Sequence, residues 1–279
     1  MTTPDTDYLR FATINGSVVA AAELKVSPLG SGFMFGEGVF ETVRVLDSRP
    51  MLFDAHFARL ASSLGYFGAA PTSSRGELYD RCAKVVTANS LENGSLKIVA
   101  FKEATGWHEL ILARSAIYAA ARYETGFRLK TVPCDLRVNP LHALKSLSNL
   151  SNIYAKRIAL AAGFDEAVFI DPHRHVLEGA TTNVFIVKDR VTSTPTLRSG
   201  ILPGVMRAHV IQLLESSGLR ECDVTLDELL EADEVFVTNA LLRIMPVSRV
   251  DQTAYDLGGN SITRGLMAAL GHRRKGDVT

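Results

Sequence analysis

The hydrophobic pattern changes its period several times along the chain, and each change predicts a new strand or helix. Near the start, two short apolar runs flank Asn15-Gly16, a pair typical of tight hairpin turns. Residues 33–45 then predict a β segment rich in Phe and Val, although Gly36 and Gly38 lie within it. Because glycine weakens a strand, we expect these two positions to mark a bulge or a close backbone approach to something bound.

From Asp54, a candidate N-cap, apolar residues recur with the 3.6-residue period of an amphipathic helix. A second helix is predicted at residues 77–88, and a returning pair of strands at residues 96–101 and 109–113. The pattern therefore predicts a small α+β domain over residues 1–120.

The rest of the chain, residues 121–279, predicts a larger domain in which strands and helices alternate. Its expected strands are residues 127–132, 167–170, 183–187 and 234–238. Its expected helices are residues 150–162, 204–216 and 262–270. The fold class expected from the two parts together is mixed α+β and α/β.

Charge and composition narrow the class of protein. The 279 residues include 30 Lys or Arg and 30 Asp or Glu, so the formal net charge is zero. This balance lacks the polybasic signature of a nucleic-acid-binding protein and gives no attraction to anionic membranes. No apolar stretch approaches the about 20 residues of a membrane span, and the polar, acidic start of the chain lacks a signal-peptide pattern. Three widely spaced cysteines favour a reduced cytoplasmic enzyme or binding protein, and no metal site is predicted.

Lys145, Glu178 and Asn183 are candidates for chemistry. Lys145 lies in a stretch with few other charges, where a dry pocket would favour the neutral, nucleophilic amine. A solvated loop lysine is the alternative, since most lysines are exposed. Glu178 and Asn183 flank a small-residue turn before a hydrophobic strand, and each could equally be an ordinary turn residue.

Two features could bind phosphate. Leu202-Pro-Gly-Val-Met-Arg207 precedes an amphipathic run, and the free backbone N–H groups of a helix start favour anions. Plain helix initiation explains this segment equally well. Arg59, on the predicted helix that begins at Asp54, is either a phosphate clamp or a solvated arginine.

Taken together and in this order, the segments resemble the pyridoxal-phosphate enzymes of fold type IV, the class IV aminotransferases and their lyase relatives. The resemblance covers residues 11–248 and implies a two-domain architecture like that of D-amino-acid aminotransferase, working as a homodimer on a small amine or amino-acid substrate. The motifs that carry it are FGEGVFETVR at 35–44, HFARL at 56–60, LKS at 144–146, NIYAK at 152–156, LEGATTNVF at 177–185, GVMR at 204–207 and ADEVFVTN at 232–239.

The resemblance also implies roles for single residues. Lys145 would hold pyridoxal 5'-phosphate as a Schiff base and move the substrate proton, and Glu178 would keep the pyridine nitrogen protonated. Arg59 would bind the cofactor phosphate together with the backbone amides of Val205 and Met206. Further cofactor contacts are implied for Asn183, Gly204, Asn239 and Ala240. Relatives usually have a threonine at position 240 and a tyrosine at 149 or 150, where this chain has Asn149 and Leu150.

The reaction remains open between two classes, and of these the lyases are the ones that the chain resembles most. A resemblance to 4-amino-4-deoxychorismate lyases, which make 4-aminobenzoate and pyruvate for folate synthesis, rests on Asn139-Pro-Leu, on Thr42 and on Arg243 with Met245. Aminotransferases of branched-chain or D-amino acids more often have Glu and Thr at the last two positions. A cofactor-binding protein without catalysis is a third reading, which the intact pair of Lys145 and Glu178 opposes.

Substrate contacts are implied for residues that match the family's pocket. Lys97 and Lys102 fall where relatives hold a carboxylate with arginine, and two solvated strand lysines are the alternative. The other expected contacts are Phe35, Phe40, Arg44, Leu241 and Arg243.

Overall fold

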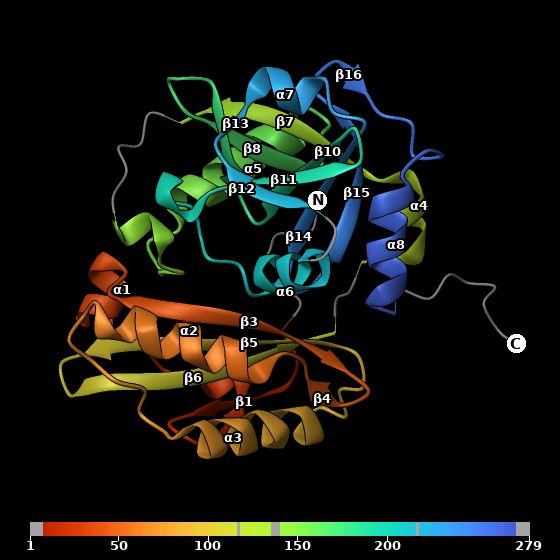
Figure 1. The fold of residues 1–279 in the computed structure, drawn as a ribbon. Helices are drawn as coiled ribbons and strands as arrows, with labels where there is room; N and C mark the ends of the chain where they lie inside the picture. The colour runs from red at the N-terminus through yellow and green to blue at the C-terminus, as the bar shows by residue number, and fades with distance from the viewer. Residues whose placement is uncertain (1–7, 116–117, 135–139, 216–217, 272–279) are drawn as a thin grey trace, which may run out of the picture. The chain divides into compact units, whose positions relative to one another are not determined.

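An antiparallel six-stranded sheet organises the first half of the computed structural model, which describes residues 8–115, 118–134, 140–215 and 218–271 (Figure 1). The sheet order is β2-β1-β6-β5-β3-β4. Its strands are β1 (Phe11–Ile14), β2 (Ser17–Ala20), β3 (Gly38–Leu46), β4 (Arg49–Pro50), β5 (Gly94–Glu103) and β6 (Gly106–Arg114). This unit comprises Met1–Ile117 together with Leu144–Asn149, a short segment that returns to it from later in the chain.

Helices α2 (Phe53–Gly65) and α3 (Arg75–Ala88) pack against one face of this sheet. Buried positions alternate along β3 because successive side chains point to opposite faces. Val39 and Val43 lie in one hydrophobic core with Leu64 of α2 and Val85 of α3. Burying such a side chain fully contributes about 1.5–3 kcal/mol, so the shared core fixes the two helices on the sheet.

Several predictions for this unit are confirmed, and two are wrong in detail. The hairpin at Asn15-Gly16, both helices and the strand pair β5–β6 are present. The predicted strand at 33–45 begins only at Gly38, because helix α1 (Ser31–Phe35) precedes it and ends on the left-handed Gly36. Asp54 is not an N-cap: the chain enters α2 through Leu52, at φ 50°, and the Asp54 carboxylate accepts from Arg75 Nε at 2.6 Å.

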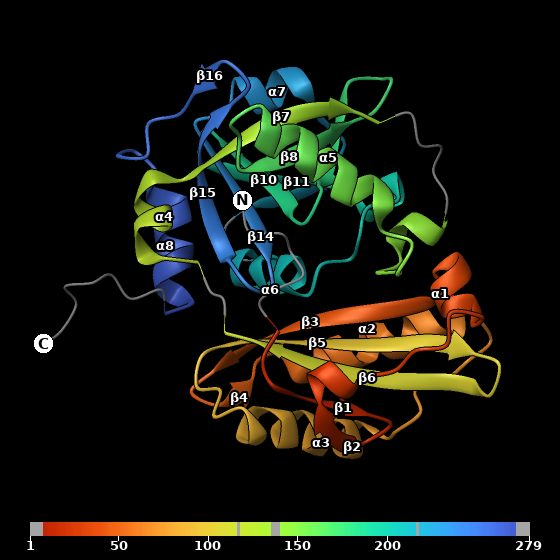
Figure 2. The same ribbon diagram turned by 180° about the vertical axis from the view of Figure 1, so that it is seen from behind.

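The second unit, Tyr118–Ala143 and Leu150–Thr279, is built on a sheet of mixed direction (Figure 2). The path β12-β11-β10-β14-β15-β7-β8-β9-β13 orders it, and β16 pairs with β15. The strands are β7 (Phe127–Pro133), β8 (Glu166–Ile170), β9 (His175–Gly179), β10 (Asn183–Lys188), β11 (Val191–Pro195), β12 (Leu219–Cys222), β13 (Val224–Thr225), β14 (Glu234–Asn239), β15 (Arg243–Val250) and β16 (Thr253–Ala254). The helices are α4 (Ala120–Thr125), α5 (Leu150–Ala161), α6 (Val205–Leu214), α7 (Leu226–Leu230) and α8 (Ser261–Ala269).

The paired central strands β10 and β14 are buried along almost their whole length. Phe185 and Phe236 stack across the pair, with ring centroids 4.8 Å apart and planes 7° from parallel. Strands β7, β8, β10 and β14 and helices α5, α6 and α8 agree with the sequence predictions to within two residues at each end. Helix α4 and strands β9, β11 and β15 were not predicted. Among the described residues, no helix combines the length and apolar character that crossing a membrane requires.

Candidate functional site

Lys145 lies on the segment Leu144–Asn149, which pairs with the start of β3. Ser146 bridges to Val39, the Lys145 carbonyl accepts from Phe40 N at 2.8 Å, and Leu147 N donates to Gly38 O at 2.9 Å. A Cβ on Gly38 would lie 2.6 Å from Leu147 Cδ1. The close neighbour of Gly38 is therefore the chain's own lysine segment, and not something bound as the sequence suggested.

The Lys145 side chain lies over an aromatic ring of β3. Its Nζ is 4.6 Å from the centroid of the Phe40 ring, and Lys97 Nζ is 4.8 Å from the same centroid. Thr42 is directly opposite Lys97 in the β3–β5 pairing. Since residues two apart along a strand share a face, Thr42 follows Phe40 on the same side of the sheet, about 7 Å away. The structure thus brings Phe40, Thr42, Lys97 and Lys145 together.

Arg59 is held by a buried carboxylate of β3. Its Nε donates to Glu41 Oε1 at 2.8 Å and its Nη2 to Glu41 Oε2 at 2.6 Å, while His56 Nδ1 lies 2.7 Å from Oε2. Glu41 is 1% exposed and His56 2% exposed. Burial by itself raises the pKa of Glu41, but the hydrogen bonds from Arg59 and His56 outweigh it and hold this pKa below its usual value. The cluster fixes the direction of the Arg59 guanidinium.

Glu178 lies near the end of β9 in the second unit. Its Oε2 accepts from Leu202 N at 3.1 Å and from Asn183 Nδ2 at 3.3 Å, and the Asn183 amide also donates to Leu202 O at 3.0 Å. Glu178 is half-buried and Asn183 is buried. These bonds join the predicted pair of Glu178 and Asn183 to the segment that leads into α6.

Helix α6 begins at Val205, and its N-cap, Gly204, has no side chain that could cap the first backbone amides. A Cβ on Gly204 would lie 2.0 Å from Asn183 Oδ1, so a larger residue at this N-cap would displace the Asn183 side chain. Val205 and Met206 follow in the first turn, where the helix dipole favours an anion.

The turn between β14 and β15 contains the remaining predicted cofactor contacts. Asn239 Oδ1 accepts from Leu241 N at 2.9 Å and from Leu242 N at 2.8 Å. Arg243 leaves the turn with φ 62°, a left-handed conformation that few residues other than glycine adopt.

The other predicted substrate residues are more dispersed. Phe35 is 76% exposed at the end of α1. Lys102 lies at the far end of β5, with its Nζ 5.7 Å from the centroid of the Trp107 ring. Arg44 continues the half-buried face of β3 beyond Thr42. Asn139, which supported the lyase resemblance, lies outside the described residues.

Sequence reasoning missed Glu41 and His56, although both lie in quoted motifs. Glu41 occupies an inward position of the alternating strand, where an acid needs a partner. His56 and Arg59 are three residues apart on α2 and share one helix face. These two signals together could have indicated the cluster.

Residues 38–250, more than half of the chain, match the amino-transferase class IV family. The chain belongs to this family. A Methanocaldococcus jannaschii protein named as a branched-chain-amino-acid aminotransferase is 32% identical over 85% of this chain and 87% of its own length. The D-alanine aminotransferase of Bacillus licheniformis is 30% identical, over 92% of this chain and 94% of that enzyme. The aminodeoxychorismate lyase of Bacillus subtilis is 29% identical over 91% of each chain.

A solved structure settles the architecture of this class IV enzyme. The branched-chain amino acid aminotransferase of Escherichia coli superposes with a TM-score of 0.87 at 25% identity, over 97% of this chain and 96% of that one. The expected fold type IV architecture is confirmed. The aminotransferase relatives are slightly more similar than the lyase, so overall identity does not support the expected closeness to lyases.

The class IV family uses pyridoxal phosphate, and the residues of this chain fit that group. The uncapped start of α6 offers backbone N–H donors of the kind that bind phosphate. Glu178 offers a half-buried carboxylate fixed by two N–H groups, which suits a protonated pyridine nitrogen. Lys145 supplies a primary amine.

Proposed function

We propose that the protein is a pyridoxal-phosphate-dependent lyase that converts 4-amino-4-deoxychorismate to 4-aminobenzoate and pyruvate. The observation that carries this proposal is a row of side chains on one face of β3. In this row Thr42 follows Phe40, and the Lys145 amine lies over the Phe40 ring. A lyase needs a base for the substrate proton and a hydroxyl for the departing enolpyruvyl oxygen, and this row offers both groups.

Each residue has a defined task in this proposal. When bound, pyridoxal phosphate supplies an electron sink. Lys145 Nζ takes the proton from the ring carbon that bears the substrate amine, and Thr42 Oγ1 donates a hydrogen bond to the leaving enolpyruvyl oxygen. Aromatisation of the remaining ring makes the step favourable, and Glu178 holds the proton on the pyridine nitrogen.

Binding falls to a different set of residues. Arg59 and the amides of Val205 and Met206 hold the phosphate, supported by the bidentate contact of Arg59 with Glu41 and by the uncapped start of α6. Asn183 keeps Glu178 in place through the 3.3 Å hydrogen bond between their side chains. Arg243 offers a cation for a substrate carboxylate at the position where aminotransferases have Glu.

A second candidate function is transamination of branched-chain L-amino acids or of D-amino acids. It is supported by the two aminotransferase relatives, at 32% and 30% identity, and by Lys97, which lies against the same Phe40 ring as Lys145. In this alternative Lys97 binds the substrate carboxylate.

A homodimer is part of the same proposal. Helix α1 exposes three apolar side chains, with Phe33 66%, Met34 57% and Phe35 76% accessible. A second subunit would remove this apolar surface from water. A single monomeric species by light scattering at micromolar concentration, still active, contradicts the dimer.

The two reactions are separated by offering substrates one at a time. The protein loaded with pyridoxal phosphate is mixed with aminodeoxychorismate, L-leucine or D-alanine, and the visible spectrum and the products are followed. The lyase proposal predicts 4-aminobenzoate and pyruvate from aminodeoxychorismate, with no lasting spectral change from either amino acid. Stoichiometric bleaching by an amino acid, with no 4-aminobenzoate formed, contradicts it and favours transamination.

A further inference from the structure

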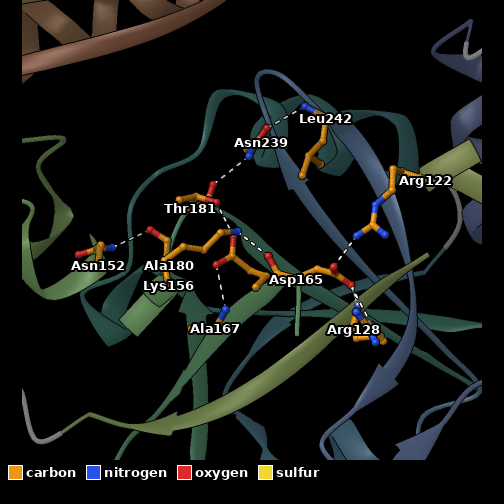
Figure 3. Close-up of polar contacts among 11 residues, drawn as sticks. Arg122, Arg128, Asn152, Lys156, Asp165, Ala167, Ala180, Thr181, Asn239 and Leu242 are labelled. Carbon is orange, nitrogen blue, oxygen red and sulfur yellow. Dashed lines mark hydrogen bonds and ion pairs between the residues drawn. The ribbon is translucent and has the colours of Figure 1, made fainter. Parts of the chain in front are cut away.

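A chain of polar contacts in the second unit connects a buried ion pair with two turns beside the proposed site (Figure 3). The contacts run from Lys156 through Glu166 and Thr181 to Asn239. The motif at residues 152–156 supports the family resemblance, yet none of its residues has a task in the proposed reaction. The contacts give this motif a role.

Both members of the ion pair, Lys156 and Glu166, make further hydrogen bonds to the backbone. Glu166 is fully buried, its Oε2 lies 3.1 Å from Lys156 Nζ, and its Oε1 accepts from Ala167 N at 2.9 Å. Lys156 Nζ also donates to Asp165 O at 2.6 Å. Because a carboxylate removed from water is costly without partners, Glu166 requires the cation of half-buried Lys156 and further hydrogen bonds, both of which it has here. The pair is therefore a fixed point in the unit.

From this fixed point the contacts reach the first turn, at residues 180–182, between β9 and β10. The Thr181 hydroxyl donates to Glu166 Oε2, and Asn152 Nδ2 donates to Ala180 O at 2.9 Å. Gly179 N donates to Thr182 O at 2.6 Å, which closes the turn. This turn joins Glu178 to Asn183.

The contacts then pass to the second turn, between β14 and β15. Asn239 Nδ2 donates to Thr181 O at 3.0 Å, so the first turn supports the second. Asn239 Oδ1 accepts from the amides of Leu241 and Leu242, and Leu242 O accepts from Tyr123 Oη at 3.0 Å. The backbone of this turn leads directly into Arg243.

We propose that Lys156 and Glu166 are positioning residues, which hold the two turns, and through them Glu178 and Asn239, in the geometry that binds the cofactor. The inference deepens the proposed function and rests on it only for the cofactor. Lys156 lies on α5 and Glu166 on β8, and they act through Thr181 and Asn239 rather than by touching the cofactor.

A purely stabilising ion pair would have a different signature. Its loss would lower the melting temperature without changing the two turns selectively. The pair of Lys130 Nζ and Asp251 Oδ1, at 2.7 Å, provides the matched control, because it is also a lysine–carboxylate pair of the second unit. Its members are more exposed, at 36% for Lys130 and 26% for Asp251 against 24% for Lys156 and 0% for Glu166, so Thr181→Val carries the comparison for the buried charge.

The experiment compares Lys156→Met, Lys156→Arg, Thr181→Val and Lys130→Met in the full-length protein, with and without pyridoxal phosphate. Amide hydrogen exchange at residues 239–243, the dissociation constant of pyridoxal phosphate and the melting temperature are measured. Thr181→Val breaks the same chain of contacts without leaving a buried charge, so it decides the question if Lys156→Met fails to fold.

Lys156→Met is expected to speed exchange of the Leu241 and Leu242 amides about tenfold and to weaken cofactor binding about tenfold, as loss of a supporting contact commonly does. Thr181→Val is expected to speed this exchange and to weaken cofactor binding about fivefold each, which is the effect of losing one hydrogen bond. Lys156→Arg is expected to restore the exchange rate and the cofactor affinity of the wild type. Lys130→Met is expected to change only the melting temperature.

Equal exchange in Thr181→Val, Lys130→Met and the wild type would overturn the positioning role. Faster exchange with unchanged cofactor affinity in the same variant would overturn its link to the cofactor. A wild type without affinity for pyridoxal phosphate would refute the proposed function, and the exchange rates of the unloaded protein would still decide whether the pair holds the turns.

Discussion

Replacing Glu41 by Gln tests how strongly one buried carboxylate organises the first unit. The side chain keeps its shape, but its Oε2 becomes an amide nitrogen that cannot accept from Arg59 Nη2 or His56 Nδ1, now 2.6 and 2.7 Å away. The variant therefore leaves a guanidinium that is only 11% exposed without its counter-charge.

The size of the effect follows from burial. Removing one partner of a buried ion pair costs about 3–5 kcal/mol, and the partial exposure of Arg59 places the expected loss near the lower limit, about 3 kcal/mol at neutral pH. Because hydrogen bonds from Arg59 and His56 hold the pKa of Glu41 below its unfolded value of 4.5, ionised Glu41 stabilises the fold above about pH 4.5. That contribution is lost as the pH falls through the lowered pKa, so the wild type and Glu41→Gln should converge in stability below pH 4.5.

Urea unfolding followed by tryptophan fluorescence measures this directly. Trp107, the single tryptophan, lies on β6 in the same unit as Glu41. Asp54→Asn is the control, because the Asp54–Arg75 pair is 77% and 51% exposed and such pairs contribute only about 0–1 kcal/mol. A loss in Glu41→Gln no larger than in Asp54→Asn, or a loss that stays constant as the pH falls from 7 through the lowered pKa of Glu41, would contradict this role of the carboxylate.

Three further predictions concern the proposed site. Lys145→Ala should abolish turnover and borohydride trapping of the cofactor, while the lost cation–ring contact costs only about 0.5–1 kcal/mol of stability; retained trapping with normal activity would show that another lysine is used. Glu178→Gln should slow turnover at least about a hundredfold, equivalent to about 2.7 kcal/mol, with a much smaller loss of cofactor affinity in an equilibrium titration; equal losses of affinity and rate would indicate a structural role. Gly204→Ala should weaken cofactor binding, because its Cβ would lie 2.0 Å from Asn183 Oδ1, and an unchanged dissociation constant would remove the start of α6 from the phosphate site.

Local patterns predicted the parts of the fold that local forces decide. Helices α2 and α3 have clear apolar faces, and the Asn15-Gly16 pair favours a tight hairpin turn by itself. The sequence was therefore sufficient to predict these three elements. The stretch 33–37 was misjudged because Phe and Met fit a strand and a short helix equally well. The left-handed conformation of Gly36, which lies against Ser148, decides between the strand and the helix. Gly36 and Ser148 are more than a hundred residues apart in the sequence.

The candidate site shows the same division. Motifs pointed to Lys145, Glu178 and the start of α6 as candidates, since each carries a recognisable local signature. The Glu41–His56–Arg59 cluster joins a strand to a helix, and the Glu166–Thr181–Asn239 contacts join a strand to two turns. Such links depend on sheet register and on how the strands are ordered, which no single stretch of sequence specifies.

The proposed reaction is tested most directly by the yield of 4-aminobenzoate per active site when aminodeoxychorismate is the only substrate and no keto acid is present. A lyase regenerates its starting state in every cycle, so we expect many equivalents of 4-aminobenzoate with equal amounts of pyruvate. We also expect Thr42→Val to lower this rate far more than it weakens substrate binding. A reaction that stops at or below one equivalent, and resumes only when a keto acid is added, would contradict the lyase and identify an aminotransferase.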